Sequence, residues 1–195
     1  MKSLKLYLLI TIIITSISSN GQEKSSSFFQ KSTTIGGFGG ISINVNDYGK
    51  SFISGEGAMI ISNYYFGGFG YGVNIGDFHS PNTGSIYDIN QGEGGFMIGA
   101  ISNKQQLISL FCELRFGFGE VDARSEIDTN IFELYQENTF SITSKIGLTI
   151  SPLNYIQLKA FAGYQGFNDI DLNGINQDVL NGFRWGFSLY FGYFK

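Results

Sequence analysis

Apolar and polar residues alternate with a period of two along most of the chain, and a helical period is hard to find. In the last run, Phe183, Trp185 and Phe187 fall on one face. Arg184, Gly186 and Ser188 fall on the other. Because side chains two apart in a strand point the same way, each such run predicts a strand with one apolar face.

Eight runs of this kind are predicted as strands. The first starts at Ile35 and ends at Val45, and the last covers Gly182 to Phe194. The others are Phe52 to Ser62, Tyr65 to Gly76, Glu93 to Ser102, Gln106 to Glu120, Thr139 to Ile150 and Tyr155 to Phe167. Several approach the roughly ten residues that a tilted strand needs to cross the hydrocarbon of a bilayer.

The predicted connections alternate in length. Short turns follow the second, fourth and sixth strands, whereas long polar loops are expected at Asp77 to Gly92, Val121 to Asn138 and Asn168 to Asn181. Only the first loop on that side, Asn46 to Ser51, is short. Short turns at one end and long loops at the other are typical of an up-and-down barrel in the bacterial outer membrane. The fold class predicted is therefore all-β, a closed antiparallel transmembrane barrel of about eight strands.

The first 21 residues have the layout of a cleaved signal peptide. Lys2 and Lys5 precede an apolar run from Leu6 to Ile14, and small polar residues follow up to Gly21. The run is shorter than the roughly 20 residues of a membrane-spanning helix. We expect a signal peptide at 1–21, a flexible lead-in at 22–32 and the barrel domain at 33–195.

Composition narrows the function classes. Removing Lys2 and Lys5 lowers the 12 basic residues to 10 against 16 acidic ones, a net charge of −6, which argues against nucleic-acid binding. The single cysteine, Cys112, allows no internal disulfide and is expected on the lipid-facing side. Only 14% of residues are charged, against about a quarter in soluble proteins.

The placement of charges separates a membrane barrel from a soluble one. A secreted soluble barrel of the lipocalin kind turns its apolar face inward and its polar face to water. The charges on the predicted strands are too few to solubilise a whole exterior. They suffice to fill a narrow interior, where we expect a polar cluster of Glu113, Arg115, Lys145, Lys159 and Arg184.

Aromatic residues are expected in two places. Glycines that interleave with Phe38, Phe69, Phe116 and Phe161 predict a crowded interior. Two belts at the lipid–water boundaries are also expected. The turn-side belt would hold Tyr64, Tyr65, Tyr155 and Tyr193, and the loop-side belt Phe78, Tyr87, Phe140, Phe167 and Trp185.

The closing segment Gly182 to Lys195 resembles the carboxy-terminal recognition strand of outer-membrane barrels, although Lys195 follows the final aromatic. With Gly36 to Gly40, Gly67 to Gly72 and the run Ala162, Gly163, Tyr164, it makes the chain from about Thr33 onward similar to the small OmpA/OmpX-type barrels. The resemblance implies a place in the bacterial outer membrane, contact with its lipid, and assembly by the barrel-insertion machinery.

Two loop motifs suggest chemistry and are weighed against simple solvation. Asp169, Asp171, Asn173 and Asp178 echo a calcium loop, but Leu180 stands where the bidentate Glu is required, so a solvated loop is the preferred interpretation. The only histidine, His79, lies near Asp77 and Ser80 without a nucleophile motif, so no catalysis and no cofactor are expected.

The acidic residues of the outer loops suggest a surface role. They could bridge divalent cations to lipopolysaccharide or contact a partner, with hydration as the simpler interpretation. These residues are Glu120, Asp122, Glu126, Asp128 and Asp178. The sequence thus predicts a structural or surface-interaction barrel, with a narrow pore, a small-molecule binder or a soluble barrel as alternatives.

Overall fold

The computed structural model describes residues 35–47, 49–79, 86–102, 107–127, 131–168, 171–172, 175–176 and 180–194. They belong to one structural unit, Thr34–Lys195. The signal peptide expected at 1–21 and the lead-in expected at 22–32 lie outside the described residues. Among the described residues, no helix has the length and apolar character that crossing a membrane requires.

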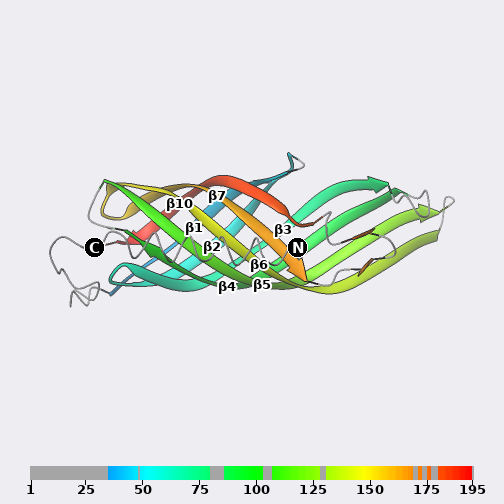
Figure 1. Ribbon diagram of the computed structural model, residues 1–195, viewed down its shortest axis with the longest axis horizontal. Coiled ribbons are helices and arrows are strands. Elements are labelled where there is room, and N and C mark those ends of the chain that lie inside the picture. The colour runs from blue at the N-terminus through cyan, green and yellow to red at the C-terminus, as the bar shows by residue number, and fades with distance from the viewer. Residues whose placement is uncertain are drawn as a thin grey trace, which may run out of the picture. The chain divides into compact units, whose positions relative to one another are not determined.

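Eight strands form a closed antiparallel barrel, which confirms the predicted fold class (Figure 1). Each strand pairs with its sequence neighbours, and β1 pairs with β10 over ten positions to close the ring. A small hairpin of β8 (Asp171–Leu172) and β9 (Ile175–Asn176) precedes the last strand. The barrel strands are β1 (Ile35–Asn46), β2 (Ser51–Ile61), β3 (Tyr64–His79), β4 (Ile86–Ile101), β5 (Ile108–Ile127), β6 (Ile131–Leu153), β7 (Ile156–Asn168) and β10 (Gly182–Tyr193).

The barrel turns its apolar side chains outward and its polar side chains inward. Strand β10 places Trp185 and Phe187 outside, 53% and 61% exposed, and buries Arg184 and Ser188 inside. The same division holds in β5 and β7, where Leu114 and Leu158 are exposed outside and Arg115 and Lys159 are buried inside. A lipocalin has the opposite arrangement, so the soluble-barrel alternative does not match this side-chain distribution.

Two connections predicted as long loops are largely strand. Strand β3 continues to His79 and β4 begins at Ile86, while β5 continues to Ile127 and β6 begins at Ile131. The sequence pattern failed here because the alternation is reversed in these extensions: Ile89, Val121 and Ala123 are buried on the inner face, and polar residues lie on the outer face, so no apolar outer face marks the strand. Cross-strand hydrogen bonds form instead, as from Asn74 Nδ2 to Asn90 Oδ1 at 3.0 Å.

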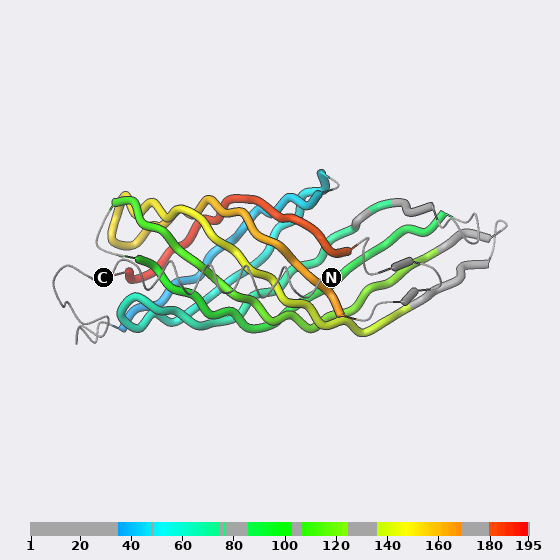
Figure 2. The backbone as a smooth tube through the Cα atoms, viewed as in Figure 1, coloured from blue at the N-terminus to red at the C-terminus, as the bar shows by residue number. Residues whose placement is uncertain are grey.

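The four central strands therefore extend past their neighbours. Strand β2 stops pairing with β3 at Tyr71, and β7 begins to pair with β6 only at Phe140. Figure 2 shows the backbone of β3 to β6 running beyond the ends of β2 and β7. Glu120 and Asp122, expected in a loop, consequently lie within β5.

The aromatic belts are only partly as predicted. Tyr64, Tyr155, Tyr193 and Trp185 are 40% to 58% exposed on the outer face, and Phe140 is partly exposed. In contrast, Tyr65, Tyr87 and Phe167 are buried. Phe116, expected inside, is 38% exposed on the outer face, whereas Phe38, Phe69 and Phe161 are buried. For Tyr65, Phe116 and Phe167 the error is one of strand parity, because neighbouring residues of a strand face opposite sides, whereas Tyr87 lies in a segment predicted as a loop that forms part of β4. The side chain of Phe78 lies outside the described residues.

Candidate functional site

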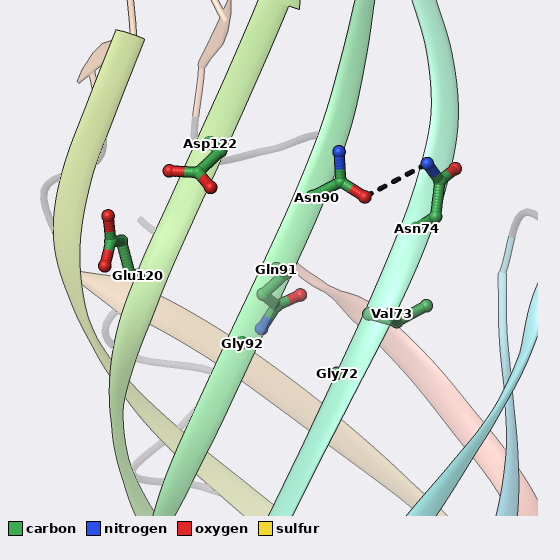
Figure 3. Close-up of a pocket in the computed structure, with 8 residues that line it drawn as sticks. All are labelled: Gly72, Val73, Asn74, Asn90, Gln91, Gly92, Glu120 and Asp122. Carbon is green, nitrogen blue, oxygen red and sulfur yellow. Dashed lines mark hydrogen bonds between the residues drawn. The ribbon is translucent and has the colours of Figure 1, made fainter. Parts of the chain in front are cut away.

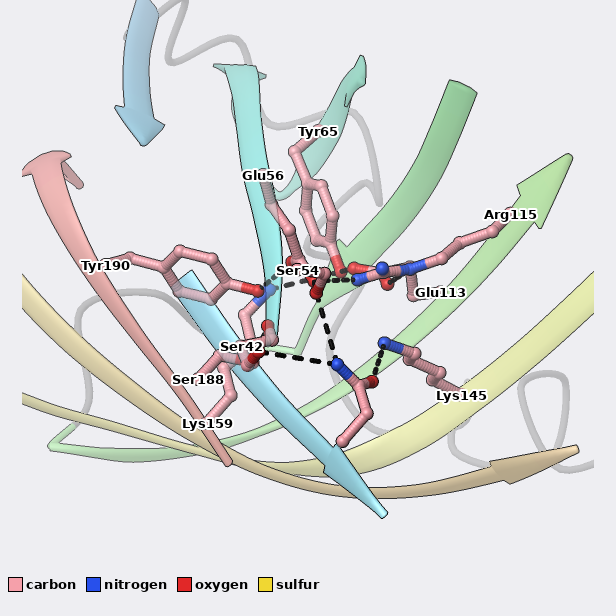
Figure 4. Close-up of polar contacts among 11 residues, drawn as sticks. Ser42, Ser54, Glu56, Tyr65, Glu113, Arg115, Lys145, Lys159, Ser188 and Tyr190 are labelled. Carbon is pink, nitrogen blue, oxygen red and sulfur yellow. Dashed lines mark hydrogen bonds and ion pairs between the residues drawn. The ribbon is translucent and has the colours of Figure 1, made fainter. Parts of the chain in front are cut away.

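An ion-paired network lies across the centre of the barrel. Arg115 Nη2 lies 2.8 Å from Glu56 Oε1, and Arg115 Nε lies 2.6 Å from Glu113 Oε1. All three side chains are buried. A charge removed from water is stable only when it is paired and its remaining hydrogen-bonding capacity is met. The guanidinium meets this demand by bridging two carboxylates contributed by β2 and β5 (Figure 4).

Tyrosine and serine hydroxyls donate further hydrogen bonds to the two carboxylates. Tyr65 donates to Glu113 Oε2 at 2.7 Å, and Tyr190 donates to Glu56 through a short hydrogen bond. Ser54 Oγ donates to Glu56 Oε1 at 3.0 Å. These donors come from β3, β10 and β2, so the network ties together strands that are far apart around the barrel.

Two lysines enter the same region without a carboxylate at ion-pair distance among the described residues. Lys159 Nζ lies between 4.3 and 5.2 Å from the ring centroids of four aromatic residues and 3.2 Å from Tyr65 Oη. The rings belong to Phe38, Tyr65, Phe111 and Tyr190. Lys145 Nζ lies 4.1 Å from the Phe161 centroid and 3.3 Å from Asn44 Oδ1. Aromatic faces thus stabilise part of the buried positive charge.

A second polar cluster lies toward the end of the barrel where β3 to β6 are extended. Glu93 accepts hydrogen bonds from Tyr71 Oη at 3.0 Å, Ser141 Oγ at 2.8 Å and Gln165 Nε2 at 2.9 Å. Arg184 donates to Tyr71 Oη at 3.2 Å, and its guanidinium lies 4.9 Å from the Phe52 centroid. This cluster is built from amides and hydroxyls around one carboxylate.

Inward-facing glycines make room for these side chains. A Cβ atom at Gly147 would lie 2.0 Å from the backbone oxygen of Ala160. At Gly117 it would lie 2.0 Å from Glu93 Oε1. Some outward-facing glycines are different, since a Cβ at Gly55 would meet nothing within 4 Å. The narrow, filled interior therefore requires glycine on its inner wall.

The five residues of the expected interior cluster all lie buried inside the barrel. Glu113, Arg115, Lys145 and Lys159 lie around the central network, whereas Arg184 belongs to the cluster around Tyr71 and Glu93. Sequence reasoning left Glu56, Glu93, Tyr65 and Tyr190 out of the site. Parity gives the signal for two of them, because Glu56 follows Ser54 on the inner face and Tyr190 follows Ser188.

The two loop motifs lie mainly outside what the structure describes. For the calcium motif, Asp169, Asn173 and Asp178 are outside the described residues, and Asp171 is described only as part of β8. Nothing is described of the side chains of Asp77 and His79, or of Ser80. Within the described part of the chain, no group of three or more His, Cys, Asp or Glu residues could hold a metal ion. Cys112 is exposed on the outer face.

Comparisons with known proteins add little to this picture. No protein-family model matches the sequence. No curated protein matches it either. Among solved structures, Neisserial surface protein A (NspA) is similar with 10% identity over 83% of this chain and 96% of that chain, at a TM-score of 0.49. Ail, the attachment invasion locus protein of Yersinia pestis, is similar with 13% identity over 82% of this chain and 95% of that chain, at a TM-score of 0.41. The fold assignment rests on the strand pairing of this chain itself.

Proposed function

We propose that this protein is an integral barrel of the bacterial outer membrane, closed along its axis, with a structural or surface-interaction role and no catalysis. The observation that carries the proposal is the distribution of large apolar side chains, which are exposed on all eight barrel strands. Examples, one per strand, are Ile41, Ile53, Phe66, Phe96, Leu114, Ile146, Leu158 and Phe187.

Hydrocarbon is the surrounding that such an exterior fits. Soluble monomers rarely expose a large continuous apolar surface, whereas transmembrane barrels carry an apolar band on the outside and polar residues inside. The hydrogen bonding between the strands also suits a membrane, because a closed barrel leaves no unpaired strand edge in the lipid. Insertion by the barrel-assembly machinery is part of the proposal and is supported by the resemblance of the aromatic final strand to the recognition strand of outer-membrane barrels.

The filled interior favours a closed barrel over a narrow pore. Arg115 spans from Glu113 to Glu56 across the lumen, and the rings of Phe38, Tyr65 and Tyr190 pack beside this network. An ion crossing the barrel would have to break these contacts. The surface role is supported by the extended parts of β3 to β6, which place polar side chains beyond the apolar exterior.

Two measurements test the proposal. The mature chain folded in detergent should migrate faster than the heated chain on a gel, and fractionation of native cells should place it in the outer membrane. Recovery of a folded, detergent-free protein from the soluble fraction would support the soluble barrel instead. In planar bilayers the wild type should show no steady conductance steps, and regular single-channel steps would favour the pore.

A further inference from the structure

A groove of about 460 Å³ lies on the outward face of β3, β4 and β5 (Figure 3). The strand register sets its shape. Gly72, Gly92 and Glu120 form one cross-strand row, and Asn74, Asn90 and Asp122 form the next. The backbone at Val73 and Gln91 completes the lining, since their side chains point to the other face of the sheet.

The groove is not a by-product of barrel packing. A Cβ atom at Gly92 would meet nothing within 4 Å, and one at Gly72 would come no closer than 3.9 Å to its nearest neighbour. Larger residues would therefore fit the fold at both positions, unlike at the inward-facing glycines. The hollow exists because these two positions lack side chains.

Each of the two carboxylates that line the groove has one oxygen that accepts no hydrogen bond from the described residues. These oxygens are Glu120 Oε1 and Asp122 Oδ1, and the two side chains that carry them are partly exposed. The neighbouring amides donate elsewhere: Asn74 Nδ2 donates to Asp88 Oδ1 at 2.9 Å and to Asn90 Oδ1 at 3.0 Å, and Asn90 Nδ2 donates to Asp88 Oδ2 at 3.3 Å. The protein therefore leaves part of the hydrogen-bonding capacity of these carboxylates unused, and a bound molecule rich in donors would use it.

Size and composition argue against a bare metal ion. The groove is many times the roughly 30 Å³ that one water occupies in the liquid, and it falls in the roughly 300–1,000 Å³ range of small-molecule sites. The described residues also provide no group of three metal-ligating side chains here. Two carboxylates beside amides fit a ligand that carries hydroxyl groups and a positive charge.

The position of the groove points to the surface of the membrane. Phe118, 57% exposed, precedes Glu120 by two residues on the same outward face, and Phe140 packs against Phe118 at 5.1 Å between ring centroids. On β5, the exposed apolar residues therefore end where the groove begins. If the barrel spans the outer membrane as proposed above, the groove lies at the level of the lipid headgroups.

We propose that this groove binds an amino-sugar unit, either free or as the headgroup of a glycolipid in the outer leaflet. The ammonium group and the hydroxyls of such a sugar donate to Glu120 and Asp122, and the sugar ring occupies the space above Gly72 and Gly92. Binding of a glycolipid headgroup depends on the membrane location proposed above, whereas binding of the free sugar does not.

The experiment uses the folded full-length mature protein and a water-soluble glucosamine disaccharide as the probe, with a glucose disaccharide for comparison. Binding is measured by calorimetry in detergent. Nanodiscs with and without a glycolipid that carries the same glucosamine disaccharide test the membrane source. Heat-modifiable gel migration of every variant shows separately that the barrel is folded.

Two variants alter the groove, and each has a matched control. Gly92→Leu fills the hollow, while Gly55→Leu adds the same side chain at another outward glycine with open space. The double variant E120Q/D122N removes both carboxylates, and Glu137→Gln removes one charge from the opposite face of β6. We expect both groove variants to weaken binding about tenfold or more and the controls to bind as wild type. Gly92→Leu acts by occupying the hollow, and E120Q/D122N acts by removing hydrogen bonds to charged acceptors.

Each possible result of these measurements either supports or overturns the proposal. Glucosamine binding that exceeds glucose binding and is lost only in the groove variants supports it, and retention of glycolipid in nanodiscs assigns the lipid source. No binding by folded wild type, or binding that the groove variants leave unchanged, overturns it. Heat released with calcium chloride alone and abolished by E120Q/D122N would make the groove a cation site and would also overturn it.

Discussion

Removing Arg115 should strongly destabilise the barrel, because it leaves two buried carboxylates without their cation. Arg115→Met keeps most of the side-chain volume but leaves the carboxylates of Glu56 and Glu113 without their cation. Both ion pairs are short, at 2.8 and 2.6 Å, and all three side chains are buried. Breaking a buried ion pair by deleting one partner costs about 3–5 kcal/mol, so the unfolding equilibrium should shift by roughly two to four orders of magnitude.

Urea unfolding in lipid vesicles measures this cost. The only tryptophan, Trp185, is 53% exposed on the outer face and reports the transfer from lipid to water. Arg124→Met, an exposed arginine on the same strand, serves as the control and should change stability by less than about 0.5 kcal/mol. The triple variant E56Q/R115M/E113Q should recover most of the loss, because neutral replacements remove the unpaired charges as well.

The reasoning would be refuted if Arg115→Met and Arg124→Met changed stability equally. It would also be refuted if the triple variant were less stable than Arg115→Met, since the cost would then not come from the stranded carboxylates.

Three further predictions follow from the two faces of the barrel wall. Phe187→Arg should lower the free energy of unfolding in vesicles by about 2–4 kcal/mol if this residue faces the bilayer centre. The control Gln136→Arg, on the polar extension of β6, should change it little. Equal losses for the two variants in urea titrations would contradict the membrane location. Gly147→Val should prevent folding because its Cβ would lie 2.0 Å from a backbone oxygen, while Gly55→Val should fold, and gel migration before and after heating would expose the opposite result. Lys159→Met should cost about 2 kcal/mol or less, below the value for Arg115→Met, because methionine also packs well against aromatic rings; a larger loss in the same urea assay would mean that the charge of Lys159 is needed.

The barrel could be predicted because the alternation of apolar and polar residues recurs in each of its eight strands. Trp185, Phe187 and Phe191 alternate with Arg184, Ser188 and Tyr190, and a one-residue shift would exchange the two faces. That constraint fixes both the strand and its orientation. It fails where the outer face is polar, which is why the continuation of β5 past Glu120 resembles a polar loop although Val121 and Ala123 are buried on its inner face.

The interior cluster was predictable in composition but not in connectivity. Charged residues on the polar face, such as Glu113 and Lys145, must point inward once the outside is apolar. Which charges pair depends on distances across the lumen, and these link residues separated by many positions in the chain. The bond from Tyr190 to Glu56 spans 134 positions, so no local pattern reveals it. The groove could not be predicted from the sequence either, because its shape depends on the strand register that aligns Gly72, Gly92 and Glu120.

Because β1 pairs with β10, the barrel can close only after the last strand has been synthesised. The ten positions of this seam join the two extremes of the barrel sequence, from Gly37 with Tyr193 to Asn46 with Arg184. A chain that lacks its final twelve-residue strand can build every other ladder of the ring and still leave open edges on β1 and β7. Exposed strand edges recruit other chains, so a truncated or prematurely released product should aggregate or require a chaperone until synthesis is complete.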